Sequence, residues 1–283
     1  MKIAVLGPGG IGSTFAFELA RAGHDVTVIA RGKRLEHLQQ DRAIVTASGK
    51  RAAVHVSAAL DTTTEWDLVL VTVLVSQVDA VLPTLAASAA KTIMFMFNTF
   101  EPFARLREAV GASRFAFGFP AILATLDEGK LASEIVTRGL LTTVTDATWA
   151  KVFTDAGIPA VVHADMESWL RTHAALVVPV MIAAATAHTR RAGVSWTEAT
   201  NLARAMDEGL RLVRRLGNTL TPAPVATVSR LPIPVLASLL WTASRLSPIR
   251  KAGAAGYSEP RTLIDAMAAA APGEIPALLA VRP

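Results

Sequence analysis

The chain contains no cysteine, and aromatic residues make up only 6% of its 283 residues. The absence of cysteine excludes disulfide bonds, thiolate metal ligands and cysteine nucleophiles. The few aromatic residues, and basic residues that are scattered along the chain, argue against a dedicated nucleic-acid-binding face. Charged residues are also few, at 18%, whereas hydrophobic residues reach 52%, which excludes a disordered or low-complexity protein. We therefore predict a folded protein with neither a nucleic-acid partner nor a metal site.

Hydrophobic runs long enough to cross a membrane are missing as well. The longest apolar run, residues 174–187, is shorter than the roughly 20 residues that a spanning helix needs, and Pro179 interrupts it. Residues 231–246 contain prolines and several polar side chains. After one lysine the N-terminus enters a glycine-rich turn, without a signal-peptide core. We expect both segments to be buried helices and the protein to be cytoplasmic, without a membrane partner.

The length suits two domains, and the first begins with a strand, a glycine-rich turn and a helix. Residues 2–6 are a short apolar run, as expected for a parallel strand buried on both faces. Gly7, Gly9 and Gly12 then follow at the G-x-G-x-x-G spacing. The apolar pattern after them predicts a helix, and residues 26–29 predict a second strand. This strand–turn–helix context is typical of a dinucleotide-binding Rossmann domain.

Each glycine of the turn has a physical role in such a site. Gly7 permits the tight turn, Gly9 lets a pyrophosphate approach the backbone, and Gly12 lets the helix pack on the strand. The start of the helix offers unpaired N–H groups and the positive end of its dipole to the phosphates. A glycine turn without a ligand is the alternative interpretation. We assign five residues of the turn to cofactor binding: Gly7, Gly9, Gly10, Ile11 and Gly12.

The end of the second strand indicates which dinucleotide is bound. NAD and FAD sites usually carry an acidic residue there, which accepts the ribose hydroxyls. Here Arg31 follows the strand, and no carboxylate occurs before Glu36. An arginine at this place can pair bidentately with the 2′-phosphate of NADP, and the net charge of +5 suits an anionic ligand. We therefore predict NADP as the cofactor; a solvated basic loop is the alternative.

The rest of the chain separates into a region of strands and a region of helices. Asn98 stands at the end of a predicted strand, where ligands of open α/β sheets bind, although asparagine is also common in turns. From about residue 165 long helical patterns replace the strands, so we place the domain boundary there. The predicted strands are residues 43–47, 52–57, 68–73, 92–97, 115–119 and 140–144, with a short segment around 135–136; the predicted helices include residues 77–90, 196–216, 231–246 and 260–271.

The residues described so far, with several later ones, resemble the ketopantoate reductase (2-dehydropantoate 2-reductase) family. The later residues are Leu70-Val71-Thr72 with Gln77 nearby, Asn98 at the start of the family's Asn-Gly motif, Glu167-x-Trp169 of its Glu-x-Trp-x-Lys pattern, and Glu259, where an acidic substrate-binding residue is expected. The resemblance covers essentially the whole chain. It implies an α/β fold class with an NADP-binding Rossmann domain over residues 1–165. An all-helical substrate-binding and catalytic domain over residues 166–283 follows.

The chain departs from the family pattern at positions that carry the chemistry. The family's general acid, a lysine two places after the tryptophan, aligns with Arg171. A second family lysine aligns with Leu74, and Thr99 rather than glycine follows Asn98. Two family asparagines are also lost, because Ala175 and Pro179 occupy or adjoin their positions. The resemblance therefore implies the fold and the class of reaction, but not ketopantoate as the substrate.

Four residues are the candidates for catalysis. Asn98 could orient the substrate or the nicotinamide, and Glu259 could bind the substrate. Arg171 can stabilise an alkoxide or bind a carboxylate, but a guanidinium is a poor proton donor near neutrality. His173 titrates in the right range, yet two residues along a helix place it roughly 200° around the axis from Arg171. The two side chains therefore cannot both face one cleft directly.

Each candidate also has a purely structural interpretation. Arg171 can form a surface pair with Glu167, four residues earlier on the helix. His173 can be a core histidine with a satisfied hydrogen bond, and Glu259, directly before Pro260, can be an N-cap or a first-turn acid. Ser247, twelve residues before Glu259, matches the spacing of a family substrate contact only loosely.

The leading hypothesis is an NADPH-dependent oxidoreductase that reduces a small 2-keto acid or a related carbonyl substrate. A second hypothesis is a non-catalytic NADP-binding sensor or partner protein, which the loss of both family lysines favours. A third is a dehydrogenase that oxidises a hydroxy acid, because the same residues would catalyse the reverse reaction. The sequence leaves the substrate, the direction and the presence of a homodimer open.

Overall fold

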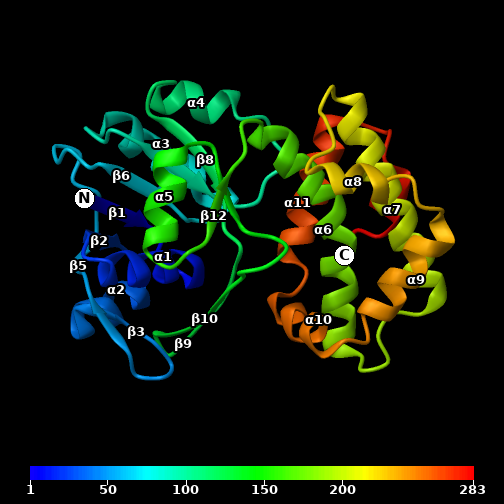
Figure 1. The fold of residues 1–283 in the computed structure, drawn as a ribbon, viewed down its shortest axis with the longest axis horizontal. Helices are drawn as coiled ribbons and strands as arrows, with labels where there is room; N and C mark the ends of the chain where they lie inside the picture. Colours follow the sequence, from blue (N-terminus) through cyan, green and yellow to red (C-terminus); the bar gives the residue numbers. More distant parts are fainter. The chain divides into compact units, whose positions relative to one another are not determined.

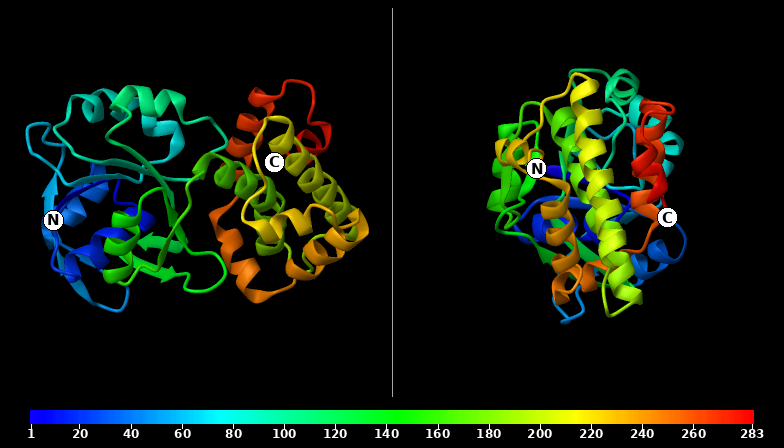
Figure 2. Two further views of the ribbon diagram at one scale, coloured as in Figure 1. Left: turned by 45° about the horizontal axis from the view of Figure 1, so that its top comes forward. Right: turned by 90° about the vertical axis from the view of Figure 1, so that its right-hand side faces the viewer.

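The computed structural model describes all residues from Met1 to Pro283 and divides the chain into two compact units (Figures 1 and 2). The first unit comprises Met1–Asn98 and Phe103–Met166. The second comprises Glu167–Pro283 together with the short segment Thr99–Pro102. The first unit is built around a sheet and the second around helices, so the fold is α/β with an N-terminal Rossmann domain and an all-helical C-terminal domain.

The first unit contains an eight-stranded sheet in the order β12-β11-β8-β7-β6-β1-β2-β5. The six strands from β8 to β5 in this order run parallel, whereas β11 pairs with β8 antiparallel and β12 follows β11. The strands are β1 (Lys2–Leu6), β2 (Asp25–Ile29), β5 (His55–Ser57), β6 (Leu68–Val71), β7 (Ile93–Met96), β8 (Phe115–Phe119), β11 (Thr142–Val144) and β12 (Ala160–Val162). Two separate hairpins complete the unit, β3 (Ala43–Val45) with β4 (Arg51–Ala53) and β9 (Ile122–Asp127) with β10 (Lys130–Ile135).

The central strands are the continuous apolar runs of the sequence. Every residue of β6 and β7 is buried, as is all of β1 after Lys2. A strand covered on both faces needs apolar side chains on both, so the alternating pattern of a half-exposed strand is absent. The predicted strands at residues 2–6, 26–29, 68–73, 92–97 and 115–119 are confirmed within a few residues at their ends.

Helices cover the sheet between successive strands. They are α1 (Gly10–Arg21), α2 (Gly32–Asp41), α3 (Val78–Ala87), preceded by a 3₁₀ turn at Val75–Gln77, α4 (Ala104–Val110) and α5 (Ala147–Asp155). Helices α1 and α5 meet through Phe15 and Phe153, whose ring centroids lie 5.0 Å apart in an edge-to-face arrangement. Both phenylalanines are fully buried in the same apolar cluster as strands β1 and β2. Aromatic pairs prefer this geometry, which helps to fix α1 on the sheet.

One predicted strand is divided in two by the structure. The sequence predicts a strand over residues 52–57, paired with residues 43–47 across a turn at Gly49. The hairpin is present as β3 and β4, but the chain turns at Val54, and β5 leaves it to pair in parallel with β2. The alternation of apolar and polar residues in a short segment shows which side chains share a face. It cannot show a change of the partner strand, because the same alternation fits either pairing.

The second unit is helical. Its helices are α6 (Met166–Thr189), α7 (Trp196–Arg215), α8 (Ala223–Val228), α9 (Ile233–Ala243), α10 (Ser247–Ala252), α11 (Ser258–Ala270) and α12 (Pro276–Ala280), with a 3₁₀ turn at Gly253–Ala255. Side chains from α6, α7, α9 and α11 share one apolar core. Figure 2 shows α7, in yellow-green, running alongside α6 within this unit. The predicted helices at residues 196–216, 231–246 and 260–271 are confirmed, with small differences at their ends.

Helix α6 runs through the core of this unit. It is continuous for 24 residues, with Pro179 inside it, rather than interrupted there. Its length and hydropathy are those of a helix that could cross a membrane, but 67% of its most apolar 18-residue window is buried inside the protein. A helix that is apolar all round suits either setting, and the extent of its burial here is that of a core helix. The expectation of a buried helix is confirmed.

Candidate functional site

The glycine turn lies between the end of β1 and the start of α1. Gly7 has a φ of +86°, a left-handed conformation that a side chain rarely adopts. A Cβ at Gly7 would also lie 2.6 Å from a methyl group of Val73. Gly7 therefore both makes the turn and lies close to the segment that follows β6.

Gly12 lies in the first turn of α1, against the ends of two strands. A Cβ there would overlap the Thr72 hydroxyl, lie 2.8 Å from the Gly7 carbonyl oxygen and lie 3.2 Å from a Val5 methyl group. Thr72 follows β6 and donates its hydroxyl hydrogen bond to the Gly7 carbonyl, at 2.9 Å. The sequence predicted close packing of helix on strand at Gly12, and these distances provide the physical reason.

The start of α1 faces open space at Gly9. Gly9 is the N-cap residue, no side chain caps the helix, and its first turn contains no acidic residue. A Cβ built on Gly9 would meet no other atom within 4 Å. By contrast, one on Gly10 would lie 2.8 Å from the Ala124 carbonyl oxygen of β9. Uncapped N–H groups at a helix start can bind an anion, so this end of α1 has the arrangement that a pyrophosphate requires.

Arg31 follows β2 at the same edge of the sheet. Strands β1 and β2 are parallel and in register, with Leu6 opposite Ile29, so their carboxyl ends lie next to each other. Arg31 is exposed and is the N-cap residue of α2. A bound dinucleotide that crosses this edge would therefore bring its adenosine ribose toward Arg31.

Arg34 is a residue of this region that the sequence analysis missed. Its Nε donates to the Pro8 carbonyl, one terminal nitrogen donates to the Gly129 carbonyl and the other donates to the Ser13 hydroxyl, each at 2.9 Å. It thereby joins α2 to the glycine turn, to α1 and to the β9–β10 turn. Burial lowers the pKa of this guanidinium, which remains charged near neutrality because arginine starts so high. The sequence carried no signal for it beyond a third basic residue after the second strand.

Asn98 lies two residues beyond β7 and is half-buried. Strand β7 pairs in parallel with β6, which pairs with β1, so the residues that follow these strands share the carboxyl edge of the sheet. Asn98, Thr72 and Gly7 therefore belong to the same edge as the glycine turn. The next residue, Thr99, is buried and accepts a hydrogen bond from the Glu101 backbone N–H at 3.1 Å.

Arg171 is buried in the second unit, with 8% of its surface exposed, and contacts four groups. Its Nε donates to the Phe100 carbonyl at 3.2 Å, and Nη1 donates to Asn218 Oδ1 at 2.5 Å. Nη2 lies 3.2 Å from a carboxylate oxygen of Glu167, one turn earlier on α6. The guanidinium also lies over the Phe100 ring, 5.5 Å from its centroid. The i,i+4 pair that the sequence left open is thus present, within a larger network.

His173 is half-buried and stacks on Trp169, one turn earlier on α6. The two ring centroids are 5.1 Å apart and the planes are inclined by 10°. Removal of the ring from water lowers the pKa of His173 to about 4. The imidazole is therefore neutral near neutrality, so it is a poor source of a proton for a reduction at that pH.

Glu259 lies in the first turn of α11, which begins at Ser258. An acidic residue at this place is favoured by the helix dipole, so the first-turn interpretation of the sequence agrees with its position. Arg171 and His173 lie on α6 and Glu259 on α11, both in the second unit, whereas the glycine turn, Arg31 and Asn98 lie in the first.

Comparison with known proteins identifies relatives of this chain. The family model described as ketopantoate reductase PanE/ApbA matches residues 3–144, half of the chain. A 2-dehydropantoate 2-reductase of Vibrio cholerae serotype O1 is 33% identical over 138 residues, which are 48% of this chain and 42% of that protein. The aligned stretch therefore spans less than half the length of this curated relative.

Solved structures extend the similarity to the whole chain. A PanE/ApbA family ketopantoate reductase from Ralstonia eutropha JMP134 has a TM-score of 0.73 at 20% identity, with 100% of this chain and 96% of that chain covered. A D-mandelate dehydrogenase solved with NADH and anilino(oxo)acetate has a TM-score of 0.73 at 12% identity, with the same two coverages. At such identities these structures show a shared fold.

Substitutions of Gly9 and Gly12, two glycines at the start of α1, should have opposite effects on stability and on dinucleotide affinity. Gly9→Ala adds a methyl group in open space, so we expect the melting temperature to change little while dinucleotide affinity falls at least about tenfold, because the methyl group would occupy the path of the pyrophosphate. Gly12→Ala is the matched control: it forces the helix from the strands and should cost about 1–3 kcal/mol of stability. Thermal unfolding and calorimetric titration with the dinucleotide measure both effects. Unchanged affinity in the folded Gly9→Ala protein would contradict the assignment.

Arg34 predicts a coupled loss of stability and affinity. Arg34→Met keeps an apolar stem but leaves the Pro8 and Gly129 carbonyls without this donor, which should cost about 1–3 kcal/mol of unfolding free energy. We expect dinucleotide affinity to fall as well, because the glycine turn loses the hydrogen bonds from Arg34 that hold it against α2. Lys33→Met, at the exposed neighbouring position, is the control and should change neither quantity. Equal behaviour of the two variants in denaturant titration and calorimetry would refute the role of Arg34.

Proposed function

The chain belongs to the ketopantoate reductase PanE/ApbA family, and we propose that it is an NADPH-dependent oxidoreductase that reduces a small 2-keto acid or a related carbonyl compound. The family acts on small keto acids and uses a nicotinamide dinucleotide. The observation that supports this proposal most strongly is the open, uncapped start of α1 beside the glycine turn, with Arg31 after the neighbouring strand. These residues all belong to the first unit.

The preference for NADP over NAD rests on Arg31. Its backbone is extended at the start of α2, and its side chain is exposed. Arg34, the other guanidinium nearby, is engaged by three hydrogen bonds to the protein. Arg31 is therefore the arginine that we assign to the 2′-phosphate, in bidentate geometry. The residues proposed for the rest of the dinucleotide are Gly7, Gly9, Gly10, Ile11, Gly12 and Asn98.

The bound coenzyme would supply the hydride, and the protein would position the carbonyl and stabilise the charge that develops on its oxygen. We assign to Asn98 the orientation of the substrate or the nicotinamide through its carboxamide. We assign to Arg171 the stabilisation of an alkoxide or the binding of a carboxylate. Its polar contacts with Phe100, Asn218 and Glu167 fix the guanidinium, as electrostatic preorganisation requires. We retain Glu259 as a substrate-binding residue and His173 as a neutral neighbour in the substrate site.

Ketopantoate itself is not part of the proposal. The family lysine that acts as general acid aligns with Arg171, and the two family asparagines align at or beside Ala175 and Pro179. Ala175 and Pro179 are buried in the core of the second unit, and neither offers a hydrogen bond from its side chain. A substrate that lacks the hydroxyl group of ketopantoate would need fewer such partners, so we favour a simpler 2-keto acid.

Two other functions have specific support. A non-catalytic NADP-binding sensor is favoured by the absence of both family lysines, since Arg171 cannot easily give up a proton. Oxidation of a 2-hydroxy acid is favoured by the structural likeness to a D-mandelate dehydrogenase. Membership of the family gives the reductase priority over both. Cytoplasmic location and a homodimer remain predictions.

The coenzyme assignment can be tested by exchange of Arg31. We expect calorimetry to show tighter binding of NADPH than of NADH, and Arg31→Gln to reduce this preference by about 10- to 100-fold, because a charged hydrogen bond to the 2′-phosphate is lost. Lys33→Gln is the matched control and should keep the preference. No preference in the wild type would refute NADP as the coenzyme. Tight NADPH binding without oxidation by any member of a 2-oxo acid panel would favour the sensor.

The role of Arg171 can be tested by restoring the residue type of the family. Arg171→Lys retains the positive charge and introduces a group that can donate a proton, so we expect turnover of 2-oxo acids by NADPH to rise at least about tenfold. Arg171→Ala should instead abolish turnover, with coenzyme affinity nearly unchanged. Circular dichroism checks that both variants fold, because Arg171 is buried. Unchanged turnover in the folded alanine variant would exclude Arg171 from the reaction, and turnover by the lysine variant no higher than that of the wild type would show that the missing proton donor does not limit the reaction.

A further inference from the structure

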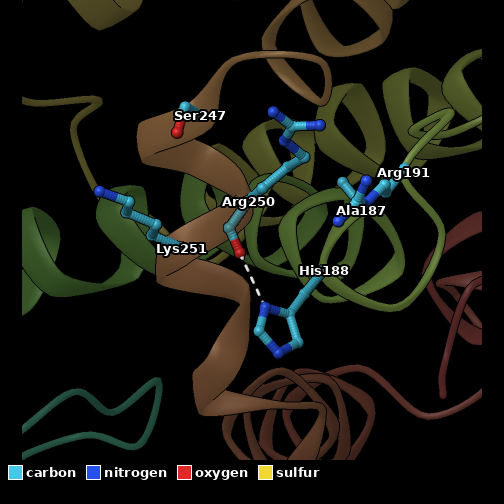
Figure 3. A pocket seen from close by; sticks show the side chains of 6 residues that line it. All are labelled: Ala187, His188, Arg191, Ser247, Arg250 and Lys251. Atoms are coloured by element: carbon cyan, nitrogen blue, oxygen red, sulfur yellow. Dashed lines mark hydrogen bonds between the residues drawn. The ribbon is translucent and has the colours of Figure 1, made fainter.

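Five of the six residues that line a pocket in the second unit are polar or basic (Figure 3). Its volume is about 350 Å³, and its residues come from the end of α6, from the turn that follows it and from α10: Ala187, His188, Arg191, Ser247, Arg250 and Lys251. Ala187 is buried, whereas Arg191, Ser247 and Lys251 are exposed. In Figure 3 the Arg250 side chain extends between Ser247 and Arg191. We call this the basic pocket.

The three cations of the basic pocket form no ion pair with a carboxylate. The segments that supply the pocket contain no Asp or Glu between residues 168 and 197 or between residues 209 and 258. No ion pair involves Arg191, Arg250 or Lys251, and their side chains form no hydrogen bond. In contrast, Arg190 pairs with Glu198, and Arg215 pairs with Glu274. Three cationic residues that line one pocket raise the local positive potential, which an anion would lower.

Other contacts fix the pocket's walls. The His188 ring contacts the Arg250 carbonyl, with Nδ1 and the oxygen 3.1 Å apart, and because a carbonyl only accepts, the ring donates. The Thr186 and Tyr257 hydroxyls lie 3.1 Å apart. Gly253, which lies between Arg250 and Tyr257 in the chain, packs so closely on the α6 backbone at Ala184 that no side chain would fit there. These contacts hold the segment from α10 to the start of α11 against the end of α6. The backbone that carries Arg250 and Lys251 is therefore fixed relative to α6.

We propose that the basic pocket binds a small metabolite through a phosphate monoester group. A phosphomonoester carries about two negative charges and three acceptor oxygens, which suit two guanidinium groups, an ammonium group and the Ser247 hydroxyl. A single carboxylate would leave most of this charge uncompensated. The volume of this open site is within the roughly 300–1,000 Å³ of small-molecule pockets, so it has room for a phosphate group and a small body attached to it. All of these residues belong to the second unit, so the proposal does not depend on the coenzyme assignment.

The test is calorimetric titration of the full-length protein with glycerol 3-phosphate, in chloride buffer of constant ionic strength. We expect saturable binding with a dissociation constant in the millimolar range or below. Arg250→Gln and Arg191→Gln should each weaken it at least about tenfold, because each removes a charge-assisted hydrogen-bonding group. Arg230→Gln is the matched control: it removes an exposed arginine from the same acid-free stretch, outside the pocket, and should leave the affinity unchanged.

Other outcomes would overturn the proposal. Loss of binding in Arg31→Gln but not in Arg250→Gln would place the phosphate at the proposed dinucleotide site of the first unit. Equal weakening by Arg230→Gln would reveal non-specific attraction to a basic surface. Equal affinity for malonate would show that the pocket selects negative charge rather than phosphate. The absence of saturable binding by the wild type would exclude the site. None of these results depends on whether the protein reduces a carbonyl compound.

Discussion

The close approach of three backbone segments at the start of α1 is the constraint on which the first unit depends. The end of β1, the residue after β6 and the first turn of α1 meet where Gly12 has no side chain, and the Thr72 hydroxyl bonds the Gly7 carbonyl. Because the Thr72 hydroxyl, the Gly7 carbonyl oxygen and a Val5 methyl group fill this space, the helix starts directly over the carboxyl edge of the sheet. Its uncapped N–H groups therefore point to the region where the strands end, which is where ligands of such sheets bind.

Arg34 extends this constraint to parts of the chain that are distant in sequence. It bonds Pro8 and Ser13 at the glycine turn and Gly129 in the β9–β10 turn, so one half-buried guanidinium joins three parts of the chain. Carbonyl oxygens and a hydroxyl accept these bonds, so the positive charge lies beside the turn, and Asp41 acts on it without forming an ion pair. Such a charge favours an anionic ligand there even without direct contact. The same residue thus contributes to the shape and to the electrostatics of the proposed site.

The sequence predicted the elements whose signal is local. The buried parallel strands, the glycine turn and the helix predicted over residues 196–216 each follow from a few neighbouring residues. It did not predict the separation of β5 from β4, because the alternation of apolar and polar residues does not show which strand a segment pairs with. It also missed Arg34, whose partners lie 21 to 95 residues away. For Arg171 it found only the local partner, Glu167, because Asn218 and Phe100 come from other parts of the chain.

The proposed reduction is constrained by the acids that are available for it. A guanidinium such as that of Arg171 is a poor proton donor, and burial lowers the pKa of His173 to about 4, so its charged form is scarce near neutrality. Neither side chain is therefore a good general acid, although a fixed guanidinium can still stabilise an alkoxide. Hydride addition to the carbonyl needs that stabilisation first, whereas the proton can arrive afterwards from water. A reductase built in this way would retain the electrostatic part of the family's catalysis while giving up the part that a lysine supplies.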